Sequence, residues 1–315
     1  MLKKEILFLW DGENWNPNGD MLRENAPRLD EETGVAEATD VRIKRTIRDE
    51  LMKQEGEDVI FIKEYKRDEN TLDCKTAIRE NLINIKQDKG ALEAEILRRF
   101  LDIRAFGGVL PISDKEEMKK DKEITTAGVH FTGPVQFRMS KSLHKVHMQH
   151  IKGTGAFASN YSQTDSAKQK QQATFREEDF LSYALFATYG IMDNHSAKKT
   201  GFSEEDAQKI IDALWYGTKN LTSRSKMGQT PRFMLIVTYK DDTFAGDLNN
   251  SIDFIGKKDD EAIRSINEYS IDFSRLKAKL ARYGDVIAKI EYYVDFDFEQ
   301  NHQEQFESSW IKIER

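Results

Sequence analysis

A strongly apolar, aromatic stretch beyond the middle of the chain does most to limit the fold. Residues 180–192 read FLSYALFATYGIM, which predicts a buried strand. Residues 233–239 (FMLIVTY) predict another strand. Between them Ser203 is placed to cap a helix, and we expect Gly217 to end it. The apolar residues of this helix follow the spacing i, i+3, i+4, i+7, i+8: Ala207, Ile210, Ile211, Leu214 and Trp215.

The N-terminal part of the chain shows the same order of elements. Residues 4–10 (KEILFLW) predict a buried strand, and residues 58–65 (DVIFIKEY) predict a second one. Between them, Thr39 or Asp40 can cap a helix that runs to about Lys53. Its apolar stripe consists of Ile43, Ile47 and Leu51.

The complete order is strand, helix, strand, a long insertion, strand, helix, strand. This is the β-α-β-β-α-β ferredoxin-like plan, which is also the plan of RNA-recognition domains. We therefore expect an α+β fold and, since no repeat or linker is visible, one domain over residues 1–315. We also expect helices at 91–101, 259–267 and 272–282, and an alternating strand at 286–298.

Composition favours a globular protein without a membrane span, because no apolar run approaches about 18 residues. The single cysteine, Cys74, rules out an internal disulfide framework and a cysteine-rich zinc site, so a cytoplasmic protein is expected. The net charge is −7, but the charges are unevenly distributed. Residues 132–176 carry seven Lys/Arg against one acid, residues 219–232 carry four against none, and residues 283–315 carry three against eight. The local basic stretches indicate an anionic partner.

The first helix carries the clearest group of cations. Arg42, Lys44, Arg45 and Arg48 fall in its first turns, and the last three occupy an arc of about 100° beside the apolar stripe. Helix N–H groups and grouped cations hold phosphates. The alternative is a solvated helix face with i,i+4 salt bridges. The acid-free stretch 219–232 favours the phosphate interpretation, because it would add a second basic edge to one sheet.

Other chemistry finds less support in the sequence. His144, His147 and His150 have a spacing that suits a metal on a helix, but no acid lies between Glu123 and Asp165 to complete the ligands. We therefore expect no metal and no cofactor. Two possibilities stay open: His144 or His195 as the general base of a ribonuclease, and loop aspartates that position a metal or a 2′-hydroxyl. Those aspartates are Asp11, Asp20 and Asp40.

Several separated motifs resemble one known family. They are NPNGD (16–20), APRLDEETG (26–34), TDVRIKRTIR (39–48), DIRAFGGVL (102–110), TGPVQFRMSKSLHKV (132–146) and TFREEDFLSYALFATYGIM (174–192). In this order they resemble the backbone subunit of type I CRISPR Cascade complexes, most closely the subtype I-B branch, with the I-C branch close. The resemblance covers roughly residues 1–239.

The resemblance implies a hand-shaped, non-catalytic protein that binds CRISPR RNA (crRNA). It implies a modified RNA-recognition palm, a helical finger insertion at about 58–113 and a protruding thumb hairpin at about 152–176. Copies would polymerise head to tail along the guide with other Cascade subunits, and the guide would pair with target DNA. With the basic stretches, it predicts these RNA contacts: Asn16, Asn18, Thr39, Arg42, Lys44, Arg45, Arg48, Arg104, Gln136, Arg138, Ser140, Lys141, Ser142, Lys145, Lys152, Arg224 and Lys226.

Two rival functions remain at this stage. The first is a RAMP-type endoribonuclease that acts on CRISPR RNA or target RNA, for which Asp40 lies near the loop that carries the catalytic aspartate in type III relatives. The second is a self-assembling scaffold that does not bind RNA. Sequence-independent RNA binding requires contacts to phosphates and 2′-hydroxyls, and the motif stretches are rich in side chains that make them.

Overall fold

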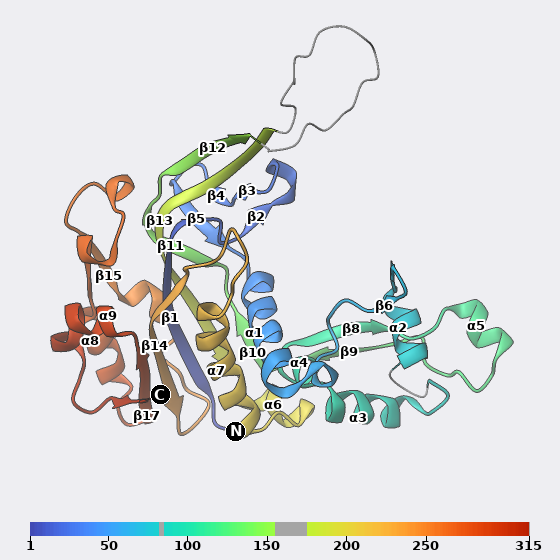
Figure 1. The fold of residues 1–315 in the computed structure, drawn as a ribbon. Helices are drawn as coiled ribbons and strands as arrows, with labels where there is room; N and C mark the ends of the chain where they lie inside the picture. Colours follow the sequence, from blue (N-terminus) through green and yellow to red (C-terminus); the bar gives the residue numbers. More distant parts are fainter. Residues whose placement is uncertain (82–84, 155–174, 315) are drawn as a thin grey trace, which may run out of the picture.

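A large mixed sheet forms the centre of the molecule (Figure 1). The computed structural model describes residues 1–81, 85–154 and 175–314. Within these, the main path of the sheet runs β18-β17-β14-β1-β13-β11-β5-β4, and β10 and β12 also pair with β13. Its strands are β1 (Lys4–Trp15), β4 (Leu29–Asp30), β5 (Val35–Ala38), β10 (Val135–Phe137), β11 (Ser140–Lys145), β12 (Met148–Thr154), β13 (Phe175–Met192), β14 (Thr230–Tyr239), β17 (Ile287–Val294) and β18 (Ile311–Lys312).

Strand β1 runs through the middle of this sheet and is paired on both sides. It is antiparallel to β13, with Phe8 opposite Thr188, and antiparallel to β14, with Phe8 opposite Met234. The strands predicted at 4–10, 180–192 and 233–239 are therefore confirmed. Strand β13 begins earlier than predicted, because its first residues pair with β12.

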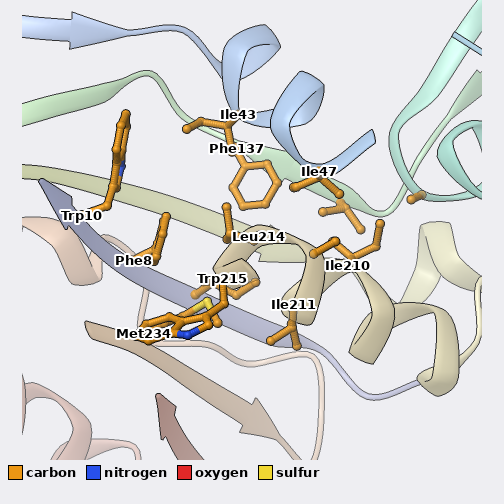
Figure 2. Close-up of a cluster of buried hydrophobic side chains, with 14 of the residues drawn as sticks. Phe8, Trp10, Ile43, Ile47, Phe137, Ile210, Ile211, Leu214, Trp215 and Met234 are labelled. Atoms are coloured by element: carbon orange, nitrogen blue, oxygen red, sulfur yellow. The ribbon is translucent and has the colours of Figure 1, made fainter. Parts of the chain in front are cut away.

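Two helices cover one face of the sheet. Successive side chains of a strand point to opposite faces, so Ile6, Phe8 and Trp10 share one side of β1. They pack under α1 (Asp40–Glu55) and α7 (Glu204–Lys219), as Figure 2 shows for Phe8 and Trp10. Both helices were predicted, and both predicted caps are confirmed: Thr39 accepts from the Arg42 N–H, and Ser203 accepts from the Asp206 N–H. A short helix, α6 (Asn194–Thr200), precedes α7.

The predicted end of α7 at Gly217 is wrong, because the helix continues to Lys219. A Cβ at position 217 would lie 2.9 Å from the Thr46 carbonyl oxygen and 2.9 Å from the Glu50 Cβ. The glycine therefore allows α7 to approach α1 closely instead of ending the helix.

The C-terminal part of the chain covers the opposite face, where Leu7 and Leu9 point. The predicted helix at 272–282 is confirmed as α8. The one predicted at 259–267 is wrong: this segment joins two antiparallel strands, β15 and β16, and it turns back through two 3-10 helices. The alternating strand at 286–298 ends at Val294, because Asp295 caps a helix. The elements here are η3 (Leu248–Ser251), β15 (Asp253–Gly256), η4 (Asp260–Ala262), η5 (Ile266–Glu268), β16 (Tyr269–Asp272), α8 (Ser274–Arg282), α9 (Phe296–His302) and η6 (Gln303–Gln305).

A third hydrophobic cluster holds together the segment that follows α1. The strand predicted at 58–65 is wrong: the Phe61 and Ile62 N–H groups donate to the Asp102 carboxylate at 2.8 and 3.0 Å instead of joining a sheet. The helix predicted at 91–101 is confirmed as α3. The elements of this segment are η2 (Glu57–Val59), β6 (Lys66–Arg67), β7 (Asn70–Thr71), α2 (Cys74–Asn81), α3 (Lys89–Arg99), α4 (Leu101–Phe106), β8 (Gly107–Pro111), α5 (Lys115–Lys120) and β9 (Gly128–Thr132).

Candidate nucleic-acid interface

The loop that follows β1 is tied to the start of α1. The Asn18 side-chain oxygen accepts from the Thr39 N–H at 2.8 Å and from the Thr39 hydroxyl at 2.9 Å. Thr39 is itself the N-cap of α1. This loop contains two short strands, β2 (Gly19–Asp20) and β3 (Ala26–Pro27), joined by the 3-10 helix η1 (Met21–Arg23). Asn18 and Thr39 therefore fix the loop against the helix, which sets the position of the first basic turn.

Arg42 lies between this loop and the segment that joins α7 to β14. Its Nε donates to the Pro17 carbonyl at 3.0 Å, and its Nη2 donates to the Gln229 side-chain oxygen at 3.3 Å. Its Nη1 donates to the Thr46 hydroxyl. These partners are all neutral, and burial lowers the pKa of Arg42 to about 10, so the guanidinium is still charged at neutral pH.

Lys226 lies beside Arg42 and shares its surroundings. Burial lowers the pKa of Lys226, and the positive charge of Arg42 lowers it further. Within the described ranges, neither side chain has a carboxylate oxygen within ion-pairing distance. We call Arg42 and Lys226 the cation pair. Two partly buried, neighbouring cations without an acid between them form a place where an anion is stabilised.

Exposed apolar side chains flank the cation pair. Val41 precedes Arg42 at the start of α1, Met227 follows Lys226, and both side chains are exposed. Figure 1 shows the segment between α7 and β14 beside the N-terminal end of α1, as the bond from Arg42 to Gln229 requires. Cations beside exposed apolar surface suit a single strand of nucleic acid, which offers phosphates and the faces of its bases.

Two more cations of α1 stand near this surface but are partly neutralised. Lys44 pairs with Asp40 at 2.9 Å and also reaches the Gln136 side-chain oxygen at 3.4 Å. Arg45 is exposed and pairs with Asp49 at 2.7 Å. These i,i+4 pairs are the alternative that the sequence left open, and on an exposed helix they contribute only about 0.3–0.5 kcal/mol each. A polyanion can therefore replace the carboxylate partners at small cost.

Arg48 and Arg104 are ion-paired inside the fold. Arg48 binds Asp102 at 2.9 Å, and the two side chains are 8% and 0% exposed. The expectation that Lys44, Arg45 and Arg48 are presented together is therefore wrong, because Arg48 is buried against Asp102 and the Phe106 ring. Arg104 binds both carboxylate oxygens of Asp206, at 2.9 and 2.8 Å. These bonds hold α4 to neighbouring elements, so we leave both arginines out of the candidate interface.

In the basic stretch at 136–145, the alternation of strand side chains separates inward-pointing serines from exposed charged residues. Ser140 and Ser142 point inward: the Ser140 hydroxyl lies 2.6 Å from the Thr188 hydroxyl, and the Ser142 hydroxyl donates to the His144 carbonyl at 2.7 Å. The charged residues between and beside them are exposed. Arg138 pairs with Asp247 at 2.5 Å, Lys141 pairs with Glu37 at 3.1 Å, and Lys145 is exposed at the end of β11.

The segment 220–229 also contacts the β12–β13 hairpin and the first loop. Arg224 pairs with Glu178 of β13 at 2.7 Å, and Lys152 of β12 pairs with Glu177 at 2.9 Å. Asn16 is buried; its N–H donates to the Ser225 carbonyl at 2.8 Å. The structure thus brings Asn16, Arg224 and Lys226 to one place. Most of the predicted thumb, residues 155–174, lies outside the described residues.

Comparison with known proteins establishes the family. The model of the family "CRISPR-associated protein Cas7" matches residues 2–274. This chain belongs to the Cas7 family. A "CRISPR-associated protein Cas7" of Haloferax volcanii is 31% identical over 298 residues, which cover 90% of this chain and 84% of that protein. The resemblance that the motifs carry is therefore confirmed for the family.

Two solved structures share the fold of this Cas7-family chain. One is a chain of a "CRISPR RNA-guided surveillance complex, pre-nicking", with a TM-score of 0.57 and 11% identity, covering 99% of this chain and 96% of that chain. The other comes from a "CRISPR RNA-guided surveillance complex", with a TM-score of 0.51 and 12% identity, covering 94% and 90%. At these identities the similarity concerns the fold alone.

Of the three evenly spaced histidines, His144 lies in β11, His147 follows it, and His150 lies in β12. Among residues 1–81, 85–154 and 175–314, no three His, Cys, Asp or Glu side chains are placed to hold a metal ion. His144 is buried: its Nδ1 lies 2.7 Å from the Lys145 carbonyl, and its Nε2 accepts from the Leu185 N–H at 3.3 Å. Both ring nitrogens are occupied, and burial lowers its pKa. In the same ranges, no helix is long and apolar enough to cross a membrane.

The three aspartates considered for chemistry have structural partners. Asp11 is buried and accepts from Arg232 at 2.8 Å and from the Tyr183 hydroxyl at 2.6 Å. Asp20 caps η1, and Asp40 pairs with Lys44. His195 is exposed and lies 2.9 Å from Asp242.

The sequence motif APRLDEETG contains one arginine that was missed as a site residue. Arg28 lies 3.4 Å from Asp20 through its Nη2, but its buried Nε has no hydrogen-bond partner. A buried donor without a partner costs about 1–3 kcal/mol, so it indicates a missing acceptor. Its backbone N–H donates to the Asn18 carbonyl at 3.1 Å, which places Arg28 beside the start of α1. No charge run signals Arg28 in the sequence; only the unsatisfied Nε identifies it.

Proposed function

We propose that this Cas7-family chain is a non-catalytic subunit that binds CRISPR RNA in a type I Cascade surveillance complex and takes part in antiviral defence. The observation that carries the proposal is the cation pair. Arg42 and Lys226 have neutral hydrogen-bond partners, which for Lys226 is the Ser225 hydroxyl at 3.5 Å, and neighbouring exposed apolar side chains. The family and the titles of the solved structures with this fold agree with a role in an RNA-guided complex.

The palm is proposed to be the four-strand core of the sheet. Its order β14-β1-β13-β11, with α1 and α7 on one face, agrees with a modified RNA-recognition plan. The segment from η2 to β9 would form the fingers, which we predicted at about 58–113, and the hairpin of β12 and β13 would carry the thumb. The motifs favour subtype I-B within type I.

The guide is proposed to be held by its backbone. A subunit that must accept any spacer sequence gains its affinity from phosphates and 2′-hydroxyls and not from base edges. Arg42, Lys226 and Arg28 would hold phosphates at the start of α1. Lys44, Arg45 and Gln136 would extend the surface along the helix, and the exposed cations on β11 and the hairpin would continue it: Arg138, Lys141, Lys145, Lys152 and Arg224. Asn16, Asn18 and Thr39 position the loop.

The proposed partners agree with this arrangement. The guide would present its bases to target DNA, copies of the chain would assemble head to tail along it, and other Cascade subunits would join the assembly in the cytoplasm. An anionic scaffold organises such an assembly, since each copy contributes its own basic surface to one continuous strand.

One experiment distinguishes this function from its rivals. Purified protein is incubated with labelled CRISPR RNA, and the products are analysed by size exclusion and on a denaturing gel. Intact bound RNA, with an affinity that falls as salt rises, supports the proposal. Cleaved RNA would support an endoribonuclease, and assembly without RNA would support a scaffold. The matched variants are Arg42→Ala with Lys226→Ala, and as a control Arg275→Ala, an exposed ion-paired arginine of α8.

A further inference from the structure

The first loop ends in an apolar tip that the fold holds in solvent. The tip consists of Met21 and Leu22 of η1, whose side chains are 91% and 95% exposed. Asp20 caps η1 through the Leu22 N–H at 3.1 Å, and the Asn25 N–H donates to the Asp20 carbonyl at 2.8 Å. Glu24 and Asn25 have positive φ values of 51° and 63°. Such strain costs about 1 kcal/mol or more per residue. It persists here because hydrogen bonds fix the turn, and this fixed turn presents the two apolar side chains to solvent.

The charges around the tip, apart from Arg28 beside the start of α1, indicate a protein partner and not a nucleic acid. Residues 19–32 carry five acids against two arginines, a net charge of −3. One of the two arginines, Arg23, pairs with Glu31 at 2.9 Å. An acidic surface repels phosphates, whereas it attracts a basic protein surface. A partner that suits the tip therefore has an apolar floor with a basic rim.

This chain contains such a surface in an open cleft of about 580 Å³ between α3, α6 and the start of α7. Ala94 and Leu97 of α3 are its apolar lining residues. It is also lined by three exposed cations, Arg98, Lys198 and Lys199, and none has an ion-pair partner within the described parts of the chain. Arg104 and Asp206 also line the cleft but neutralise each other. The cleft thus has the opposite charge to the tip.

The tip and the cleft lie at opposite ends of the helical layer. The tip belongs to the loop fixed at the start of α1, whereas the cleft includes the start of α7, which lies near the end of α1 through the Lys209–Glu55 pair. Figure 1 shows β2 and β3 at the upper end of α1, and α6 and α3 at its lower end. Complementary surfaces at opposite ends of one chain form a heterologous contact, which continues from copy to copy.

We infer that the Met21–Leu22 tip of one copy docks in the α3–α6 cleft of the next copy. This inference rests on the proposed head-to-tail assembly along RNA and names the protein contact within it. The apolar tip covers Ala94 and Leu97, and the acids of the tip loop face Arg98, Lys198 and Lys199. The contact makes RNA loading cooperative without adding an RNA contact.

The first test compares two RNA lengths. Met21→Ser with Leu22→Ser, and separately Arg98→Glu with Lys198→Glu, are measured on a single-stranded RNA that holds one copy and on one that holds several. Both double variants are expected to bind the short RNA within about twofold of wild type and to bind the long RNA about tenfold more weakly, without cooperativity. Ile255→Ser changes another exposed apolar residue and serves as the control. It is expected to leave the affinity for the short RNA and for the long RNA unchanged. If the tip variant lost as much affinity for the short RNA as for the long RNA, the inference would be overturned and the tip would be an RNA contact.

The second test does not depend on RNA binding. In a Cys74→Ser background, which removes the exposed cysteine, copies with Leu22→Cys are mixed with copies with Lys198→Cys and treated with a short bis-maleimide. A cross-linked dimer is expected for this pair and not for Leu22→Cys mixed with Lys289→Cys on β17. Cross-linking without RNA binding would refute the proposed function but keep the contact. RNA binding without the selective cross-link would refute the contact alone.

Discussion

Removal of the Arg48 side chain separates a structural role from an RNA-binding role within one helix. Arg48 is the charge partner of Asp102, whose carboxylate is 0% exposed. Breaking a buried ion pair by removing one partner costs about 3–5 kcal/mol, because the other charge remains buried. Here the Phe61 and Ile62 N–H groups still hold the Asp102 carboxylate at 2.8 and 3.0 Å. We therefore expect Arg48→Ala to lower the free energy of unfolding by about 3 kcal/mol, the lower end of that range.

The assay follows stability and RNA affinity in the same preparations. Urea unfolding should show the loss for Arg48→Ala, and hydrogen exchange should show it first at residues 60–62 and in α4, which the Arg48–Asp102 pair joins to α1. The double variant Arg48→Leu with Asp102→Asn should recover part of the loss, since the amide keeps an acceptor without a buried charge. RNA affinity per folded molecule should not change. Normal stability of Arg48→Ala together with weak RNA binding would refute the assignment of Arg48 to the core.

Three further predictions follow from the same contacts. Arg42→Ala with Lys226→Ala should weaken RNA binding and reduce the slope of log affinity against log salt by about 1.4, at about 0.7 for each phosphate contact on a single strand, in titrations at several salt concentrations. Burial lowers the pKa of His144 and His302 below the ordinary 6.5, so the unfolded chain binds more protons and stability should fall as pH drops below 6.5; urea midpoints from pH 7 to 5 check this, and His144→Gln should reduce the dependence. Gly217→Ala should cost about 1–3 kcal/mol in thermal unfolding, because the new Cβ meets the α1 backbone.

The sequence predicts the elements whose pattern is local. Local patterns predict three strands and two helix caps, and all are confirmed: the apolar runs of β1, β13 and β14, and the caps Thr39 and Ser203. The errors arise where a distant contact decides. Residues 58–65 have the composition of a strand, but the Asp102 carboxylate takes the N–H groups of Phe61 and Ile62 that a sheet would need.

The candidate site is less predictable than the fold, because a cation's role depends on its partner. Helical periodicity places Arg45 and Arg48 on one arc, yet one is exposed and the other is buried against Asp102, which is distant in the sequence. The role of Lys226 is equally unpredictable from the sequence, because only the fold brings it beside Arg42. Sequence therefore identifies the basic segments, and the structure decides which of their charges remain available.

The covered sheet limits where RNA would bind under the proposed function. RNA-recognition domains ordinarily stack bases on an open sheet face through exposed aromatic side chains. Here Phe8 and Trp10 lie under α1 and α7, and Leu7 and Leu9 lie under the C-terminal part, so both faces of β1 are occupied by protein. Under the proposed function, RNA would therefore bind at the rim, where the start of α1 meets the segment 220–229. A rim offers cations and backbone groups instead of an aromatic platform, so it favours binding that does not depend on base sequence, as a subunit that carries any guide requires.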